Sequence, residues 1–396
     1  MTSHADSILD LARRCVASFS TADAAAQMGE ANMAFGLAKI LWAQQEAGAP
    51  PRACFIASPD STITRNTNRW ASGFGYGGKL VSEWPEPTVV LDAKPNACGM
   101  LVGGLAEVPA ADEVAVRLQE MLSRPAELQG VPVRWDFAVS NHFVDLFSSH
   151  SFAGGPELPP CVFIIHGSCP ELREATDLGP GLYWDKSPAL MARADVVATP
   201  WGPLRLLRGP AATEYLEFFD RAADFAAEKR LMAARALFGD FQPLANLFHQ
   251  GLLSTGEMLL GCHHALWEQP LPLTLRPDLP SYLLKGMPNL GEDVVARRSG
   301  GPGVPDFVVQ SLRCANIVPH GGGYVLDGFR GLRRAWSVGD LRFFELERES
   351  SEATDILTDP GGLPARYRGR QVLMLTMEWG LAQVGARLDP VLVIKA

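Results

Sequence analysis

The sequence has no long apolar run. Its N-terminus, MTSHADSILDLARRCVASFSTADAAA, lacks the apolar core of a secretory signal, and no later stretch of ~18 apolar residues could span a bilayer. We therefore expect a cytoplasmic protein without membrane contact. Charged residues make up only 20% of the chain against 47% hydrophobic residues. This composition excludes a disordered protein and predicts a globular fold with a sizeable core.

Cysteine is also sparse, with seven residues among 396. Their number is odd, their spacing is wide, and most of them lie inside apolar runs, which is unlike the disulfide framework of a secreted domain. We therefore expect any functional cysteine to be a metal ligand or a nucleophile.

Two common nucleotide-binding fingerprints are missing. The glycine-rich segment GFGYGGK at 73–79 lacks the Gly, Lys and Ser/Thr spacing of a phosphate loop, and no dinucleotide fingerprint appears. The net charge of −9 argues against an extensive, sequence-independent grip on nucleic acid. Arginines nevertheless cluster within 297–298, 330–334 and 366–370. These clusters would either hold phosphates bidentately or form solvated charged faces.

Helix and strand patterns are mixed without regular alternation. Residues 1–50 are alanine-rich with apolar residues at helical spacing, and they predict an N-terminal helical segment that ends at the Pro50–Pro51 pair. Residues 213–238 predict an amphipathic helix closed by Gly239. Runs such as TVVLDA, PPCVFIIHG and PVLVIKA predict strands. This mixture favours an α+β fold over a doubly wound parallel sheet.

Only eight histidines occur, and four of them lie at the ends of apolar strand-like runs or beside glycines. One such histidine is more often structural than functional. Taken together, they indicate a site, because neutral imidazole and thiolate are suitable ligands for zinc, manganese, iron or cobalt. Sequence spacing alone does not show the geometry of such a site.

Short motifs containing these residues follow one another in a distinctive order. They are Cys-Gly-Met at 98–100, Asn-His-Phe at 141–143, an apolar run into His-Gly-Ser at 166–168, Cys-His-His at 262–264, Lys-Gly at 285–286 and His-Gly-Gly-Gly at 320–323. The order resembles the RtcB family of RNA-splicing ligases, whose elements are Cys-Gly-Met, Gly-Asn-His-Phe, His-Ser-Gly-Ser, His-Asn, Arg-Lys-Gly-Ala and His-Gly-Ala-Gly-Arg. LPARYRGR and LDPVLVIKA extend the resemblance, which covers about residues 88–396.

The resemblance implies a fold and an activity. Residues 51–396 would form a single large RtcB-like catalytic domain, in which mixed β-sheets flanked by helices surround a central cleft for metal and nucleotide. The activity would be GTP-dependent joining of an RNA 3′-phosphate to a 5′-hydroxyl through a histidine-guanylate. The implied cofactors are GTP and Mn²⁺ or another divalent metal, and the implied partners are RNA ends.

The resemblance also assigns roles to individual residues. His320 matches the nucleophile that attacks the α-phosphorus of GTP. His263 is adjacent to a predicted ligand and could face the metal instead, although the resemblance favours His264. The matched metal ligands are Cys98, His142, His166 and His264. The matched nucleotide-binding residues are Asn141, Asp145, Gly321, Gly322, Gly323, Tyr367 and Lys395.

The chain departs from the family pattern around metal and phosphate. Pro95 replaces a metal-binding Asp, and Asp92 or Asn96 lie close enough in sequence to substitute for it. Ala265 replaces the Asn after the histidine pair, Tyr324 replaces the Arg after the glycines, and only Pro59-Asp60 remains of a Pro-Asp-x-His element. Three hypotheses follow: an RNA ligase with an altered or single-metal site, a guanylyltransferase with a non-RNA acceptor, and a catalytically silent binding protein.

Overall fold

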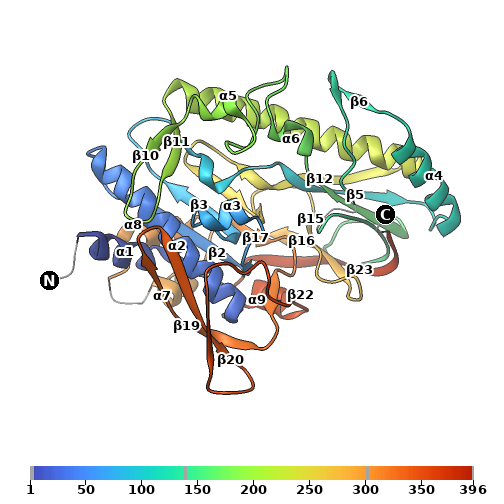
Figure 1. Ribbon diagram of the computed structural model, residues 1–396. Helices are drawn as coiled ribbons and strands as arrows, with labels where there is room; N and C mark the ends of the chain where they lie inside the picture. The colour runs from blue at the N-terminus through green and yellow to red at the C-terminus, as the bar shows by residue number, and fades with distance from the viewer. Residues whose placement is uncertain (1–3, 138–140, 300–302, 395–396) are drawn as a thin grey trace.

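A large mixed sheet organises the chain in the computed structural model, which describes residues 4–137, 141–299 and 303–394 (Figure 1). Among the strands of this sheet that lie in the described ranges, only β1 and β2 pair in parallel. The order of its eleven strands is β1 (Val16–Ser18), β2 (Ala53–Thr62), β3 (Tyr76–Ser82), β13 (Glu257–Leu260), β12 (Gln242–Leu252), β5 (Cys98–Leu105), β9 (Cys161–Gly167), β8 (Phe143–Ser151), β23 (Ala382–Ile394), β16 (Ser281–Gly286) and β15 (Leu271–Leu273).

Smaller sheets surround the main sheet. Two have three strands: β10 (Asp195–Val197), β11 (Leu204–Arg208) and β4 (Thr88–Val90); and β19 (Phe329–Val338), β20 (Leu341–Arg348) and β21 (Thr354–Leu357). Three have two strands: β14 (Cys262–His264) with β17 (Ile317–Pro319), β18 (Tyr324–Leu326) with β22 (Ala365–Tyr367), and β6 (Glu127–Leu128) with β7 (Val131–Pro132).

Helices cover the main sheet, with α6 above it and α2 below it in the view of Figure 1. α6 packs on β5, β9 and β12, whereas α2 packs on β2 and β19. The helices are α1 (His4–Arg14), α2 (Ala24–Glu46), α3 (Thr67–Ala71), α4 (Ala111–Ser123), α5 (Pro188–Met191), α6 (Pro210–Phe238), α7 (Glu292–Ser299), α8 (Asp306–Arg313) and α9 (Gln371–Glu378), with 3₁₀ turns at η1 (Leu91–Ala93) and η2 (Pro170–Arg173).

The predicted α+β class is confirmed, and the chain forms one domain. The helix predicted over 213–238 is α6, which begins at Pro210 and ends before Gly239, a residue with a positive φ of 69°. Residues 1–50 supply the predicted helices as α1 and α2, and they also supply β1, which extends the main sheet. The N-terminal segment is therefore built into the same domain.

Two glycines let α2 lie unusually close to its neighbours. A Cβ on Gly29 would lie 2.6 Å from the carbonyl oxygen of Thr62, and one on Gly36 would lie 2.3 Å from that of Gly73. Any side chain at either position would push the helix away, so glycine is required there. The helix consequently presses on the end of β2, the strand that carries Asp60.

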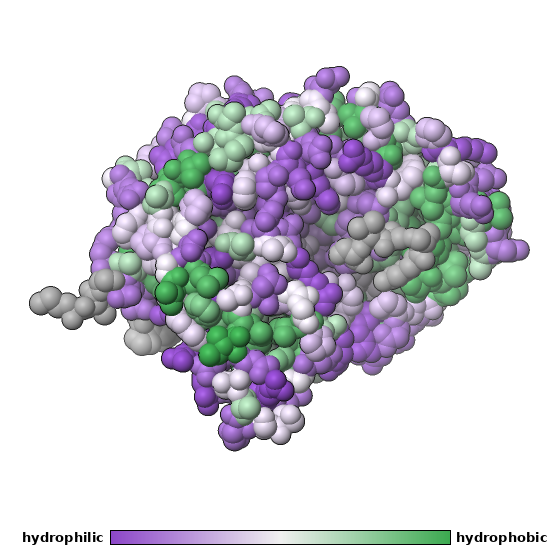
Figure 2. Space-filling model, viewed as in Figure 1, coloured by the Kyte–Doolittle hydropathy of each residue, from purple (hydrophilic) through white to green (hydrophobic). Residues whose placement is uncertain are grey.

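The surface is mostly polar on the face drawn in Figure 2, where hydrophilic residues are interrupted by smaller hydrophobic groups. Within the three described ranges, no helix has the length and apolar character needed to cross a membrane.

Candidate metal and nucleotide site

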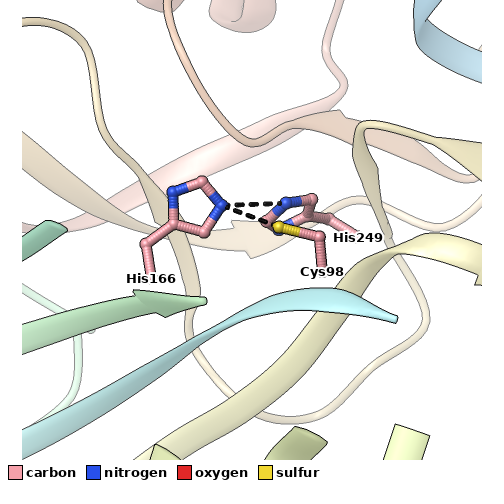
Figure 3. A group of neighbouring side chains, drawn as sticks. All are labelled: Cys98, His166 and His249. Atoms are coloured by element: carbon pink, nitrogen blue, oxygen red, sulfur yellow. Dashed lines mark hydrogen bonds between the residues drawn. The ribbon is translucent and has the colours of Figure 1, made fainter. Parts of the chain in front are cut away.

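Cys98, His166 and His249 form a buried group whose possible ligand atoms all lie within 4.8 Å of one another (Figure 3). The Cys98 Sγ lies 3.1 Å from His166 Nε2, which lies 3.3 Å from His249 Nε2. No side chain of the three is more than 3% exposed. One thiolate and two imidazoles at such distances could hold a metal ion and would leave a further coordination position open.

Strand register explains why Cys98 and His166 meet. Side chains two residues apart on a strand share a face, so Cys98 and Met100 point to the same side of β5. Met100 lies directly opposite His166 on β9. His166 is therefore the diagonal neighbour of Cys98 on that face.

A β-bulge brings His249 to the same place. Phe248 of β12 pairs with Gly99 of β5, and Gln250 pairs with Cys98, so His249 is the extra residue between two consecutive partners. A bulge of this kind bends the strand and changes the direction of a side chain. His249 consequently lies beside Cys98 in Figure 3.

Hydrogen bonding fixes the protonation of His166. Its Nδ1 lies 3.0 Å from the main-chain carbonyl oxygen of Asn141. Because a carbonyl only accepts hydrogen bonds, Nδ1 carries the proton and Nε2 keeps its lone pair toward Cys98 and His249. Burial lowers the pKa of both His166 and His249 well below the ordinary range. Both imidazoles are therefore neutral, as metal ligands must be.

His142 lies on the other side of Cys98, with its Nε2 3.3 Å from the sulfur. Its Nδ1 is 3.0 Å from Asp136 Oδ2. Burial acts to lower the pKa of His142, but the negative charge of Cys98 and the hydrogen bond to Asp136 outweigh it and raise the pKa to about 10. Without metal, His142 is therefore protonated at neutral pH.

His320 adjoins this group, with its ring centroid 4.2 Å from that of His249. The His320 Nδ1 donates to Asp60 Oδ2 at 2.9 Å, and the main-chain amides of His320 and Gly321 donate to the same oxygen at 3.2 Å each. Ser58 donates to the other oxygen of this carboxylate. Asp60 thus keeps a proton on His320 Nδ1 and fixes the ring so that Nε2 faces away from the carboxylate.

The glycines at 321–323 form a turn after His320. This turn packs against β2, the strand that carries Asp60. A Cβ on Gly323, whose φ is +61°, would lie 2.3 Å from the Asp60 carbonyl oxygen. A buried guanidinium, that of Arg368, lies beneath the turn and donates to the carbonyls of Gly322 and Asp60 at 3.4 Å each. Gly323 therefore has no room for a side chain.

A pocket opens in front of His320 and His166. Phe143, Asp145 and Phe147 line it from alternate positions of β8, on the face that also carries His166, because Phe143 lies opposite His166. Six of the seven residues predicted to bind nucleotide line this single pocket: Asn141, Asp145, Gly321, Gly322, Gly323 and Tyr367. The seventh, Lys395, lies outside the residues that the structure describes.

Aromatic side chains form one wall of the pocket. The rings of Tyr324 and Tyr367 stack with centroids 4.9 Å apart, and the guanidinium of Arg65 lies 4.8 Å above the Tyr324 ring. Tyr324 therefore contributes an aromatic face where the family pattern has an arginine.

Two predicted ligands are not members of this group: His142 lies beside Cys98, and His264 lies on β14. Neighbouring residues on β14 face opposite sides, and the pairing of β14 with β17 turns His263 inward. His263 is fully buried and its Nε2 donates to the Pro272 carbonyl at 2.9 Å, while the half-buried His264 lies beside Trp267. His249 stands in the group instead.

The two residues considered as substitutes at Pro95 have other partners. Asp92 accepts from the guanidinium of Arg205 at 3.0 Å, and the side chain of Asn96 accepts from the Cys98 amide at 3.0 Å. Each therefore stabilises the local backbone or a neighbouring charge.

Sequence reasoning missed His249 and assigned no role to Asp60 or Asp136. A signal for His249 was present, because it interrupts the apolar run LFHQGLL and is followed by Gln250, an amide like the Asn of the family's His-Asn element. Asp60 was visible only as the remnant of the Pro-Asp-x-His element. Asp136 carried no signal, because its partner His142 is reached through a loop.

Most of the clustered arginines pair with carboxylates. On β19, Arg330, Arg333 and Arg334 form ion pairs with glutamates on β20 and after it. Arg366 pairs with Asp327, and Arg368 with Asp23. These arginines form charged faces or internal braces.

No protein-family model matches the chain, and no curated protein sequence matches it.

Proposed function

We propose that this protein is a metal-dependent nucleotidyltransferase of RtcB-like type, in which His320 accepts a guanylate from GTP and passes it to an RNA 3′-phosphate before joining to a 5′-hydroxyl. The observation that carries the proposal is the Asp60–His320 pair. The 2.9 Å contact to Asp60 holds Nδ1 as a hydrogen-bond donor and leaves Nε2 free of the carboxylate, in a histidine that lines the pocket.

The first step is the transfer of the guanylate from GTP to His320. The His320 Nε2 would attack the α-phosphorus of GTP, forming an N–P bond as the bond to the bridging oxygen breaks and pyrophosphate leaves. No proton need leave the ring, because the resulting positive imidazolium is stabilised by the Asp60 carboxylate at Nδ1. An oxygen of the acceptor phosphate would then take the guanylate and release His320.

The donor set fits a divalent metal. Cys98, His166 and His249 offer three ligand atoms in a buried group, and the neutral imidazoles need no further deprotonation. A bound divalent ion would polarise a phosphate oxygen and offset charge in the transition state. Thiolate and imidazole suit zinc, cobalt and iron as well as manganese, so the ligand set alone does not select Mn²⁺.

The pocket fits a purine nucleotide in chemical character. Asp145 offers a carboxylate 7% exposed, of the kind that accepts from the amino and ring N–H groups of guanine. Tyr367 and Tyr324 offer aromatic faces for stacking. The turn at 321–323 permits close approach of a phosphate to the backbone.

A second candidate keeps the guanylate step but serves a non-RNA acceptor. The pairing of the arginine clusters with carboxylates favours it, because paired guanidinium groups bind backbone phosphates less readily. Binding of short RNA that weakens steeply with salt would favour the RNA acceptor. Guanylate turnover indifferent to RNA would favour the second candidate.

The test is mass spectrometry of the purified chain after incubation with GTP and Mn²⁺, with Zn²⁺ and Co²⁺ in parallel. We expect the wild type to gain the mass of one guanylate, and the His320→Ala variant to gain none. His150→Ala is the matched control, because His150 is an exposed histidine on β8 whose Nε2 lies 3.5 Å from Asp389 Oδ2. A metal-loaded, folded wild type without an adduct would falsify the proposal.

A further inference from the structure

Three buried charges close to the cysteine and histidine group have no role in the function proposed above. Lys229 of α6 lies 3.2 Å from Asp136 Oδ1 and 3.1 Å from Glu171 Oε1. Lys229 is 0% exposed, and each carboxylate residue is 5% exposed. Removing such charges from water is costly even when they are paired. One lysine facing two buried carboxylates therefore leaves one of the carboxylates in excess.

Glu171 alone is enough to pair with Lys229. Both of its carboxylate oxygens approach the ammonium group, at 3.1 and 3.3 Å, and the carbonyl of Arg134 accepts a further bond at 3.0 Å. Asp136 is therefore a second carboxylate beside a lysine that already has a partner.

The other oxygen of Asp136 points to His142. Asp136 Oδ2 lies 3.0 Å from His142 Nδ1, and the amide and hydroxyl of Ser168 hold this oxygen in place at 3.0 and 2.9 Å. The main-chain carbonyl of Asp136 lies 3.1 Å from the same ring nitrogen. His142 Nδ1 thus meets two acceptors from one residue, which fixes the plane of its ring.

Because Asp136 fixes the His142 ring in this way, His142 Nε2 faces the group of Cys98, His166 and His249 and lies 3.3 Å from Cys98 Sγ. We propose that Asp136 is a positioning residue of the metal site: it holds His142 so that Nε2 stays against the cysteine that anchors the metal ligands. The inference rests on the metal site of the proposed function, but it does not depend on GTP, RNA or His320.

The alternative is a purely structural role, in which Asp136 only joins its loop to α6 and η2. The two roles predict different results when His142 is absent. A positioning residue that acts through His142 loses its effect on metal binding once that ring is removed, whereas a structural residue keeps its effect.

The experiment is a Co²⁺ titration of the metal-free full-length chain, followed by visible absorption and by competition with a chelator. We expect Asp136→Ala to weaken Co²⁺ binding about 10- to 100-fold, the range typical of groups that orient metal ligands. Asp136→Asn keeps an acceptor of the same shape and should recover part of the loss. Lys229 retains Glu171 in both variants, so both should fold, as far-UV circular dichroism would show.

Two controls complete the test. Ser168→Ala removes a hydroxyl bond to Asp136 without touching His142, and it should weaken Co²⁺ binding less than Asp136→Ala. In a His142→Ala background, Asp136→Ala should cause no further loss. Equal losses in the two backgrounds, or wild-type affinity in Asp136→Ala, would overturn the inference.

The outcome is separable from the test of the proposed function. A wild type that binds no Co²⁺ would overturn both the metal site and the inference. A wild type that binds Co²⁺ with the expected coupling, yet forms no guanylate adduct, would overturn only the proposed function.

Discussion

The Asp60–His320 pair and the arginine–glutamate pairs of β19 and β20 each join a carboxylate to a nitrogen donor. The first pair is buried, whereas the others lie at the surface. Asp60 and His320 are 1% and 6% exposed, and amide and hydroxyl donors hold the carboxylate from several sides. The guanidinium groups of Arg330, Arg333 and Arg334 are about half exposed or more. Buried pairs fix the direction of a side chain, whereas pairs in solvent gain little free energy.

The largest effect is expected at the buried pair. Asp60→Asn replaces the carboxylate with a neutral amide, which no longer stabilises a positive His320. The amide can also donate to Nδ1, so it permits the tautomer that carries its proton on Nε2. We expect the single-turnover rate of guanylate formation to fall by about 10³- to 10⁴-fold, as for a serine-protease triad that loses its carboxylate. Ser58→Ala is the control, because it removes a bond to the other oxygen of Asp60 and leaves His320 untouched. A rate within a few-fold of wild type in Asp60→Asn would contradict this role.

The next largest effect is a difference in metal affinity between variants of His249 and His264. His249→Ala removes a ligand atom and should weaken Zn²⁺ binding by at least about 100-fold, more than the loss of an orienting group. His264→Ala should leave the affinity close to that of wild type, because His264 lies beside Trp267 and outside the group. Isothermal titration of metal-free protein measures both. The reverse order of losses would restore His264 as a ligand.

A smaller effect is expected at the ion pair between Asp23 and Arg368, beneath the turn at 321–323. Asp23 accepts from Arg368 at 2.6 and 2.8 Å and also caps α2 at the Ala26 amide. Asp23→Ala leaves a guanidinium with 0% side-chain exposure unpaired. We expect a loss of roughly 2–3 kcal/mol in the free energy of unfolding, below the ~3–5 kcal/mol of fully buried pairs because Asp23 is 22% exposed. Urea unfolding measures it, and Asp23→Asn, which keeps the cap, isolates the charge.

The same pair makes stability depend on pH. Burial acts to raise the pKa of Asp23, but the hydrogen bonds and charge of Arg368 outweigh it and hold the pKa below its ordinary value of 3.8. A lowered folded-state pKa stabilises the protein above the unfolded pKa, and the contribution is lost as the pH falls through the folded value. The difference in unfolding free energy between wild type and Asp23→Asn should therefore shrink below about pH 4. A constant difference down to pH 2 would argue against the ion pair.

The smallest effect is expected on the exposed sheet. Arg330→Ala removes the pairs to Glu347 and Glu352, both at its surface-exposed guanidinium. Many such pairs contribute nothing measurable, so we expect an unchanged midpoint of thermal unfolding. If this midpoint fell as far as in Asp23→Ala, the contrast between the two regions would be lost.

The pattern of apolar and polar residues was enough to predict the α+β class, the helix now seen as α6 and the strand β9, which carries His166. The resemblance in motif order, and not this pattern, singled out six residues that line one pocket. Neither could predict that His249 joins Cys98 and His166, since the bulge between Phe248 and Gln250 depends on how β12 meets β5. The inward turn of His263 likewise depends on the pairing of β14 with β17.

The separation of Cys98, His166 and His249 in sequence has a consequence for folding kinetics. Cys98, His166 and His249 lie on neighbouring strands, but long stretches of chain, including the whole of α6, separate them in sequence. Contacts between residues so far apart in sequence are slow to form, because they require the costly closure of large loops. The nascent chain therefore offers metals only isolated donors until the sheet closes. Metal capture would be a late event that favours the native state by mass action.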